Sequence, residues 1–198
     1  MRILGALLLL ALLSACATTS RERIELPEIS SWEARKAVLS ELSEWEFRGR
    51  IGVKAGDDGF NGKLRWIQNG DDFMATVGGP IGIGTVRIAG NSESVTLTDK
   101  DGVETALLDV EQELMLRYGW TIPVRSLRYW ALGIPDPHDV AETVVNNSDE
   151  LEKLVQRGWI VSISRYKDIG GQSMPSRLLV EGNATRVRLV VDSWYFFK

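Results

Sequence analysis

Cysteine and histidine are almost missing from this chain of 198 residues, which has one of each, Cys16 and His138. A single cysteine excludes an internal disulfide, and it leaves the folded part without a cysteine-based metal site or thiol chemistry. A single histidine, with no serine in the context of a nucleophile elbow, is a poor basis for nucleophilic catalysis. We therefore expect no enzyme activity, no catalytic residue and no metal site.

Long apolar runs and excess positive charge are also missing. After residue 15, no segment is long and apolar enough to be a transmembrane helix. Removal of residues 1–15 would leave 22 basic residues against 27 acidic ones. A mildly acidic protein gives no electrostatic reason to expect binding to nucleic acid.

The N-terminal segment has the pattern of a lipoprotein signal peptide. Arg2 precedes the apolar residues 3–13, and the small residues Ser14 and Ala15 precede Cys16. A basic start, a short apolar run and a small-residue cleavage site are typical of a secretory signal peptide. An ordinary signal peptide that happens to end near a cysteine is the alternative, but the position of this one cysteine favours a lipoprotein. We expect residues 1–15 to be removed, and Cys16 to receive diacylglycerol and an N-acyl chain.

The residues after Cys16 indicate location and organisation. Ala17 stands where an aspartate would retain a Gram-negative lipoprotein in the inner membrane. We therefore expect an outer-membrane anchor and a protein that faces the periplasm. Residues 16–30 are predicted to be the acylated N-terminus and a polar tether, which contains Pro27. Residues 31–198 are long enough for a single domain with a sizeable core.

Alternation of polar and apolar residues predicts β-strands at residues 47–54, 62–66, 73–77, 85–88, 95–98, 159–166 and 186–191. Tight-turn signals between them are typical of an antiparallel meander, open or barrel-like. One face would be apolar. The other would be basic, through Arg48, Arg50, Lys54, Lys63, Arg65, Arg87, Arg186 and Arg188. A packed core under solvated charges is the simpler interpretation, and a hydrophobic cavity follows if helices cover the sheet loosely.

Helical signals lie before the strand-rich part and between its halves. Ser30 and Ser31 can cap a helix over residues 32–44, and an acidic first turn predicts a helix over residues 110–118 that ends at Gly119. Pro123 and Gly133 bound another helix. Residues 148–157 also look helical locally.

The glycine-rich segment 78–84 is an unusual turn, because the aliphatic Ile81 stands at its tip, where polar residues are normal. Two interpretations stay open on physical grounds. The loop folds back so that Ile81 joins the core, or Ile81 forms a protruding apolar finger that enters a membrane or a partner.

Several motifs resemble the LolB family of outer-membrane lipoprotein receptors in Gram-negative bacteria. They are Arg48-Gly49, Trp66-x-Gln68, Pro80-Ile81-Gly82, the block from Ile122-Pro123 to Gly133-Ile134-Pro135, Met174-Pro175 and Asp192-x-Trp194. The resemblance implies a mainly β fold with helices (α+β). In it, an incomplete antiparallel β-barrel encloses a hydrophobic cavity under a helical lid. It also makes residues 151–156 a strand.

The resemblance further implies a function. The protein would accept lipoprotein cargo from the periplasmic chaperone LolA, hold the acyl chains in its cavity and insert the cargo into the outer membrane. It would need outer-membrane phospholipid, no nucleic acid and no cofactor beyond its own lipid, and would act as a monomer. Pro80, Ile81 and Gly82 match the family's membrane-insertion hairpin, with isoleucine in place of leucine. The residues that we expect to line the cavity are Ile51, Leu64, Trp66, Phe73, Val77, Ile88, Leu97, Leu127, Trp130 and Leu189.

Two alternatives remain from the sequence. An outer-membrane lipoprotein of this kind could bind free lipid or scaffold envelope assembly. An envelope hydrolase would use His138, although a surface-loop histidine is the simpler interpretation.

Overall fold

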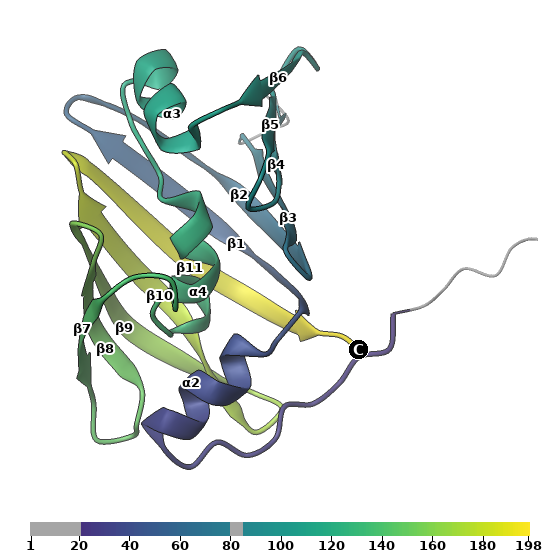
Figure 1. Ribbon diagram of the computed structural model, residues 1–198, viewed down its shortest axis with the longest axis vertical. Helices are drawn as coiled ribbons and strands as arrows, with labels where there is room; N and C mark the ends of the chain where they lie inside the picture. The colour runs from purple at the N-terminus through teal and green to yellow at the C-terminus, as the bar shows by residue number, and fades with distance from the viewer. Residues whose placement is uncertain (1–20, 80–84) are drawn as a thin grey trace, which may run out of the picture.

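The computed structural model describes residues 21–79 and 85–198, which form one sheet and three helices (Figure 1). The predicted signal peptide (1–15), Cys16 and the hairpin residues Pro80, Ile81 and Gly82 lie outside the described residues. Within the described part, no helix has both the length and the apolar character needed to cross a membrane.

The sheet has eleven antiparallel strands in the order β6-β5-β4-β3-β2-β1-β11-β10-β9-β8-β7. Its first and last strands in sequence, β1 and β11, pair at the centre, and its edges β6 and β7 do not pair with each other. The predicted incomplete antiparallel barrel is thereby confirmed. The strands are β1 (Glu44–Ala55), β2 (Asp58–Asn69), β3 (Asp72–Gly78), β4 (Thr85–Gly90), β5 (Val95–Thr98), β6 (Glu104–Leu107), β7 (Ala141–Val145), β8 (Leu151–Gln156), β9 (Trp159–Ile169), β10 (Gln172–Gly182) and β11 (Thr185–Phe196).

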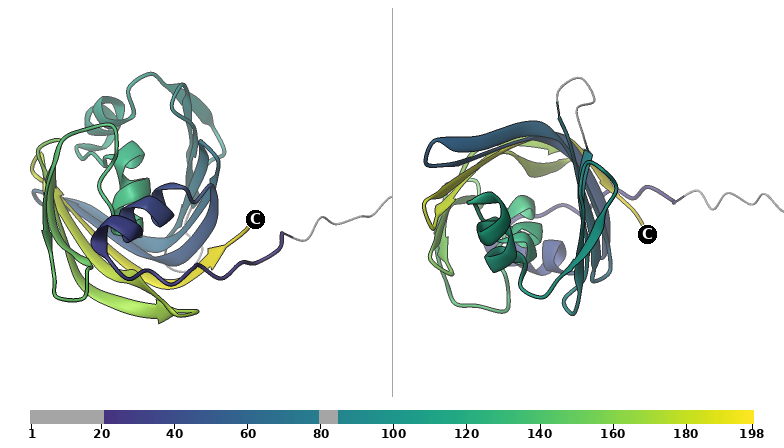
Figure 2. Two further views of the ribbon diagram at one scale, coloured as in Figure 1. Left: turned by 60° about the horizontal axis from the view of Figure 1, so that its bottom comes forward. Right: turned by 90° about the horizontal axis from the view of Figure 1, so that it is seen from above.

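The sheet curves strongly, so that it wraps around the helices, which lie on its concave side (Figure 2). The period-two pattern sets which side chains face inward. On β1, Ile51 and Val53 are buried, whereas Arg50 before them and Lys54 after them are exposed. The concave side therefore holds the hydrophobic core, and the convex side holds the predicted basic residues.

Two of the helices begin and end as the sequence predicts. In α3 (Val110–Tyr118) the Asp109 side chain accepts a hydrogen bond from the Gln112 backbone N–H at 3.0 Å. Gly119 and Gly133 end α3 and α4 (Val124–Leu132) with φ of 72° and 78°, a conformation that glycine adopts without strain.

Helix α2 (Trp32–Ser40) is shorter than predicted, since it ends at Ser40 and not at residue 44. From Glu44 the backbone pairs with β2 and β11, and the ring of Trp45 stacks on Trp66 with centroids 6.2 Å apart. Strand pairing and this stack stabilise an extended backbone where the local pattern favours a helix.

The helical prediction for residues 148–157 is wrong, because residues 151–156 form strand β8, as the family resemblance implies. The Asn146 side chain accepts hydrogen bonds from the backbone N–H groups of Ser148 (2.8 Å) and Glu150 (3.1 Å), which closes a turn before the strand. Leu151 and Leu154 are then fully buried. Long-range packing outweighs local propensity in this segment.

Candidate functional site

A cavity of about 580 Å³ lies between the sheet's first five strands and the segment that runs from the end of α3 into α4. Its size falls within the range of about 300–1,000 Å³ that is usual for small-ligand sites. The wall is largely apolar, with polar side chains at its edge from Asp58, Asn61 and Arg117.

Seven of the ten side chains expected at a cavity line this one. They come from five neighbouring strands and from α4, and they are Ile51, Leu64, Trp66, Val77, Ile88, Leu97 and Leu127. The inward face of strands β1–β5 thus forms a continuous apolar floor beneath the helices.

The other three expected residues lie in the packed core and not in the cavity wall. Phe73 stacks on Trp66 with ring centroids 5.2 Å apart, and Leu189 is 1% exposed opposite Ile51. Trp130 is fully buried and donates a hydrogen bond from Nε1 to Gln156 Oε1 at 2.8 Å. Periodicity identifies the inward face of a strand or helix, but not which part of that face another element covers.

Several lining residues were not among those expected. Phe60 continues the inward alternation of Leu64 and Trp66, so a longer reading of that strand would have included it. Trp120 lies in a connection without periodicity, and its ring is 5.1 Å from Phe60 and 5.4 Å from Tyr118. The other unexpected side chains in the wall that are aliphatic are Ala75, Val86, Ile122 and Val124. The three adjacent rings, of which Tyr118 and Trp120 are stacked and Phe60 is tilted, form an aromatic edge where the sheet meets the helical segment.

Polar contacts hold α4 over the cavity. Arg128 donates to Asp71 at 3.0 Å and to the Gly70 carbonyl at 3.3 Å, which ties the helix to the β2–β3 turn. Hydrogen bonds from Ser92, together with Arg128, lower the pKa of Asp71, so its carboxylate stays charged at neutral pH. On the other side, Gln156 accepts from Trp130 and donates to the carbonyls of residues 136 and 139.

The one histidine belongs to a cluster around Asp136. His138 Nδ1 lies 2.9 Å from one carboxylate oxygen, and Ser126 Oγ donates to the other at 2.8 Å. Burial raises the pKa of Asp136, but hydrogen bonds from His138 and Ser126 outweigh it, so the pKa is lowered. The carboxylate stands between serine and histidine, whereas a hydrolase triad requires the histidine between the other two.

No set of three His, Cys, Asp or Glu side chains with metal-binding geometry occurs among residues 21–79 and 85–198. The cavity wall itself offers a ligand mainly apolar contacts and an aromatic edge.

Comparison with known proteins identifies the family. Residues 43–194 match the family model described as "Outer membrane lipoprotein LolB". The chain belongs to the LolB family. One LolB relative, the outer-membrane lipoprotein LolB of Nitrosococcus oceani, is 33% identical over 189 residues, which cover 95% of this chain and 94% of the relative. LolB of Pseudomonas aeruginosa PAO1 is 32% identical over 196 residues, 98% of this chain and 96% of its own.

Solved structures with a similar fold extend the comparison beyond LolB. A crystal structure of a LolA superfamily protein from Nitrosomonas europaea aligns with a TM-score of 0.55 at 9% identity, over 85% of this chain and 94% of that one. A DUF1329 family protein from Desulfovibrio piger aligns with a TM-score of 0.51 at 6% identity, over 83% and 90%. At these identities the likeness concerns the fold, and it places this LolB-family sheet among open barrels with helices inside.

Proposed function

We propose that this LolB-family chain is an outer-membrane receptor for lipoproteins that faces the periplasm. It accepts cargo from the chaperone LolA, holds the acyl chains in the 580 Å³ cavity and inserts the cargo into the inner leaflet of the outer membrane. The observation that carries the proposal is this apolar cavity under α4, in a chain whose relatives are outer-membrane lipoproteins.

Free energy explains why such a cavity is needed. A fatty acyl chain of about fifteen methylenes costs on the order of 12 kcal/mol to leave in water, at ~0.8 kcal/mol each. Cargo must therefore pass from one apolar environment to another. Transfer without nucleotide hydrolysis runs downhill, so this cavity must hold acyl chains more tightly than LolA and less favourably than the bilayer.

The surface beside α3 suits a handover. Large apolar side chains are exposed on this helix and just before it, among them Leu108 (97% exposed) and Leu116 (77% exposed). Tyr118 is also exposed, and it lines the cavity. Exposed apolar groups that continue into a cavity are typical of an interaction surface and not of a solvated helix. We place LolA docking at this surface.

The membrane step is assigned to Ile81. Strand β3 ends at Gly78 and β4 begins at Thr85, opposite each other in register, so Ile81 belongs to the connection between two paired strand ends. An apolar residue in such a hairpin can enter the acyl region of a bilayer, whereas a carboxylate cannot do so without a large desolvation cost.

Both steps can be tested with one pair of measurements on the acylated chain. Purified LolA loaded with lipoprotein is mixed with wild-type chain or with Ile81→Glu, and cargo is followed first to the receptor and then to liposomes. Ile81→Glu should accept cargo normally and fail to deliver it. Normal delivery by Ile81→Glu would contradict the role of Ile81, and failure of the wild-type chain to accept cargo would overturn the whole proposal.

The same experiment addresses the alternative of a free-lipid carrier. Native mass spectrometry of the mixture distinguishes bound phospholipid from bound lipoprotein. If the chain extracts phospholipid but never takes cargo from LolA, the free-lipid function replaces the one proposed.

A further inference from the structure

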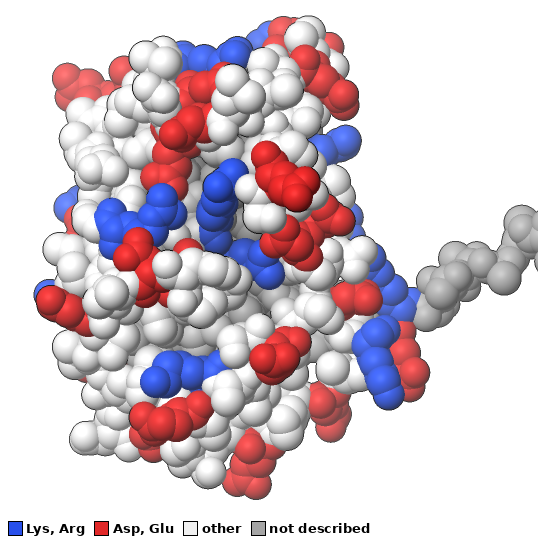
Figure 3. All heavy atoms as spheres, in the orientation of Figure 1, with Lys and Arg blue, Asp and Glu red and all other residues white. Residues whose placement is uncertain are grey.

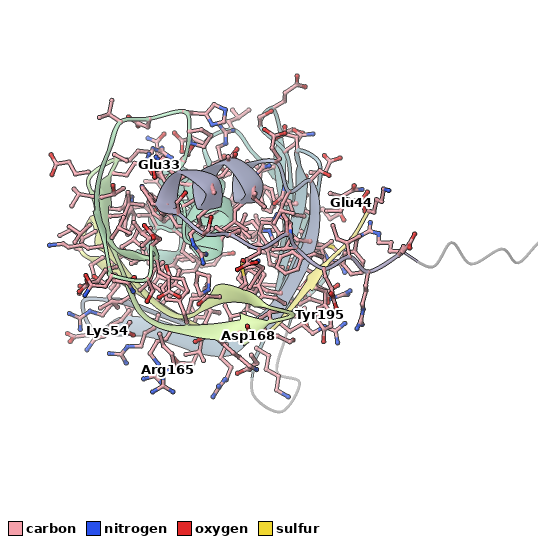
Figure 4. All side chains as sticks on the ribbon, turned by 90° about the horizontal axis from the view of Figure 1, so that it is seen from below. Glu33, Glu44, Lys54, Arg165, Asp168 and Tyr195 are labelled. Atoms are coloured by element: carbon pink, nitrogen blue, oxygen red, sulfur yellow. The ribbon has the colours of Figure 1, made fainter. Side chains whose placement is uncertain are left out.

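The convex side of the sheet is basic, although the chain as a whole is acidic. Outward positions on the five central strands hold nine cations, which we call the basic face: Arg48, Arg50, Lys54, Lys63, Arg65, Arg165, Arg177, Arg186 and Arg188. Lys54 and Arg165 point away from the barrel (Figure 4). On the side that carries the helices, acidic and basic side chains are interspersed (Figure 3). Positive charge is therefore concentrated on one side.

Folding alone does not account for this face. Arg50 lies opposite Lys63 and Arg165 opposite Arg177 in the strand register, and like charges in such positions destabilise a sheet. Glu46 binds both Arg48 and Arg65, Asp192 binds Arg50, and Glu181 binds Arg186. Within the described part of the chain, no carboxylate lies within ion-pair distance of the other five cations, Lys54, Lys63, Arg165, Arg177 and Arg188.

The basic face has a recess at its centre. Gly52 has no side chain, and a Cβ there would lie 2.5 Å from Asn61 Oδ1. Above it is a depression of about 350 Å³, which Arg50, Lys63 and Arg188 line. A second depression of about 500 Å³ shares Gly52, Asn61 and Arg188. Its wall adds Lys54 and Arg186 together with the acidic residues Asp57 and Asp58, whereas no acidic residue lines the depression over Gly52. Guanidinium and ammonium groups beside an open recess are suited to a phosphate group.

The basic face also continues to the point where the tether reaches the fold. The Ile24 backbone N–H donates to the Phe196 carbonyl at 3.0 Å. Next to this contact is Tyr195, which is labelled in Figure 4. The guanidinium group of Arg23 lies 4.6 Å from the centroid of its ring, and that of Arg48 lies 5.5 Å from it. Arg21 is the fifth residue after Cys16, so the two are at most about 18 Å apart. An acylated Cys16 would therefore keep this end of the face close to the bilayer.

We propose that the basic face binds the anionic phospholipid headgroups of the membrane to which the chain is anchored. Arg50, Lys63 and Arg188 hold a headgroup phosphate in the recess over Gly52. The charge of the face complements an anionic bilayer, and the short tether brings the two together. The membrane location rests on the proposed function, but headgroup binding does not require cargo.

The test measures vesicle binding without the lipid anchor. A chain that begins at Ala17 keeps every strand, helix and contact described above, because these lie within residues 21–198. Its sedimentation with vesicles of phosphatidylcholine alone is compared with that on vesicles containing 30% phosphatidylglycerol. Each basic residue near an anionic surface contributes about a fivefold gain in binding, so Lys63→Gln with Arg188→Gln should lose on the order of 25-fold. The wild type should bind the phosphatidylglycerol vesicles and lose that binding as salt is added.

A double variant on the helix side, Lys36→Gln with Arg125→Gln, removes equal charge and should bind as the wild type does. Equal losses in both double variants, or no preference for phosphatidylglycerol, overturn the proposal. Exchange of chloride for inorganic phosphate at constant ionic strength separates the two phosphate sources. Free phosphate offers the recess the same group, so it should weaken vesicle binding of the wild type more than the residual binding of Lys63→Gln with Arg188→Gln. Equal weakening in both would overturn the recess as the headgroup site.

Cargo transfer by the acylated variants keeps this proposal distinct from the function itself. If vesicle binding falls as expected while no form of the chain accepts cargo, the proposed function fails and the headgroup site stands. If Lys63→Gln with Arg188→Gln loses only acceptance from LolA and binds vesicles normally, the face serves an acidic protein and the headgroup site is overturned.

Discussion

Filling the cavity from its floor should weaken acyl binding without weakening the fold. Ala75 lies on β3 between Trp66 and Ile88 in register, and its side chain lines the cavity. Ala75→Leu adds three carbon atoms, which take the space of about three ligand methylenes. At ~0.8 kcal/mol each, this costs about 2.4 kcal/mol of acyl binding, or roughly a 60-fold rise in Kd.

The same substitution should leave the free energy of unfolding unchanged or raise it, because the added carbons enter empty space. A well-packed core would instead lose about 1–3 kcal/mol on such an enlargement. The assays are displacement of a fluorescent fatty acid and urea unfolding, both on the chain that begins at Ala17. Ala106→Leu on β6, which is exposed and outside the cavity wall, is the matched control. Unchanged fatty-acid affinity in Ala75→Leu, or a clear loss of stability, would refute the cavity as the acyl site.

Three further predictions concern residues outside the cavity. Burial raises the pKa of Glu46, but hydrogen bonds from Arg65 and Arg48 outweigh it and lower the pKa below its ordinary value of 4.5. The stability from the ionised carboxylate is therefore present above about pH 4.5 and lost below it. In urea unfolding, Glu46→Gln should be less stable than the wild type at pH 7, and its free energy of unfolding should fall less between pH 5 and pH 3. If the free energies of unfolding of the two proteins fall in parallel with pH, this role of Glu46 is excluded. Gln156→Leu leaves the Trp130 indole N–H and other buried groups unpaired. The free energy of unfolding should therefore fall by at least about 3 kcal/mol, and a fall of less than about 1 kcal/mol would contradict the importance of these hydrogen bonds. His138→Ala should leave cargo transfer unchanged, and a large loss would favour the hydrolase interpretation.

Features set by local chemistry could be predicted from the sequence. Helices α3 and α4 have the predicted bounds because their ends depend on neighbouring residues in the chain, namely the Asp109 cap and the glycines at 119 and 133. The apolar and basic faces of the sheet also agree with the prediction, because the alternation of side chains along a strand determines which residues share a face. The sequence also predicts seven of the residues in the cavity wall, once the sheet is taken to be curved.

Features set by long-range packing could not be predicted. Residues 151–156 have a local helical pattern, and only pairing with β7 and β9 makes them a strand. Strand β10, which holds Pro175, gave no recognised signal, although it lies between β9 and β11. The sequence pattern of inward-facing apolar residues is the same for the residues in the cavity wall and for Phe73, Trp130 and Leu189. The latter three differ only in that other side chains pack over them. Cover by a second element is a property of the tertiary structure.

The central claim is that cargo passes through this protein on its way from LolA to the outer membrane. Depletion of the protein from living cells, followed by isolation of LolA from the periplasm, tests it most directly. The account predicts that LolA–lipoprotein complexes accumulate while newly made lipoproteins fail to reach the outer membrane. Normal delivery, with LolA free of cargo, would contradict it.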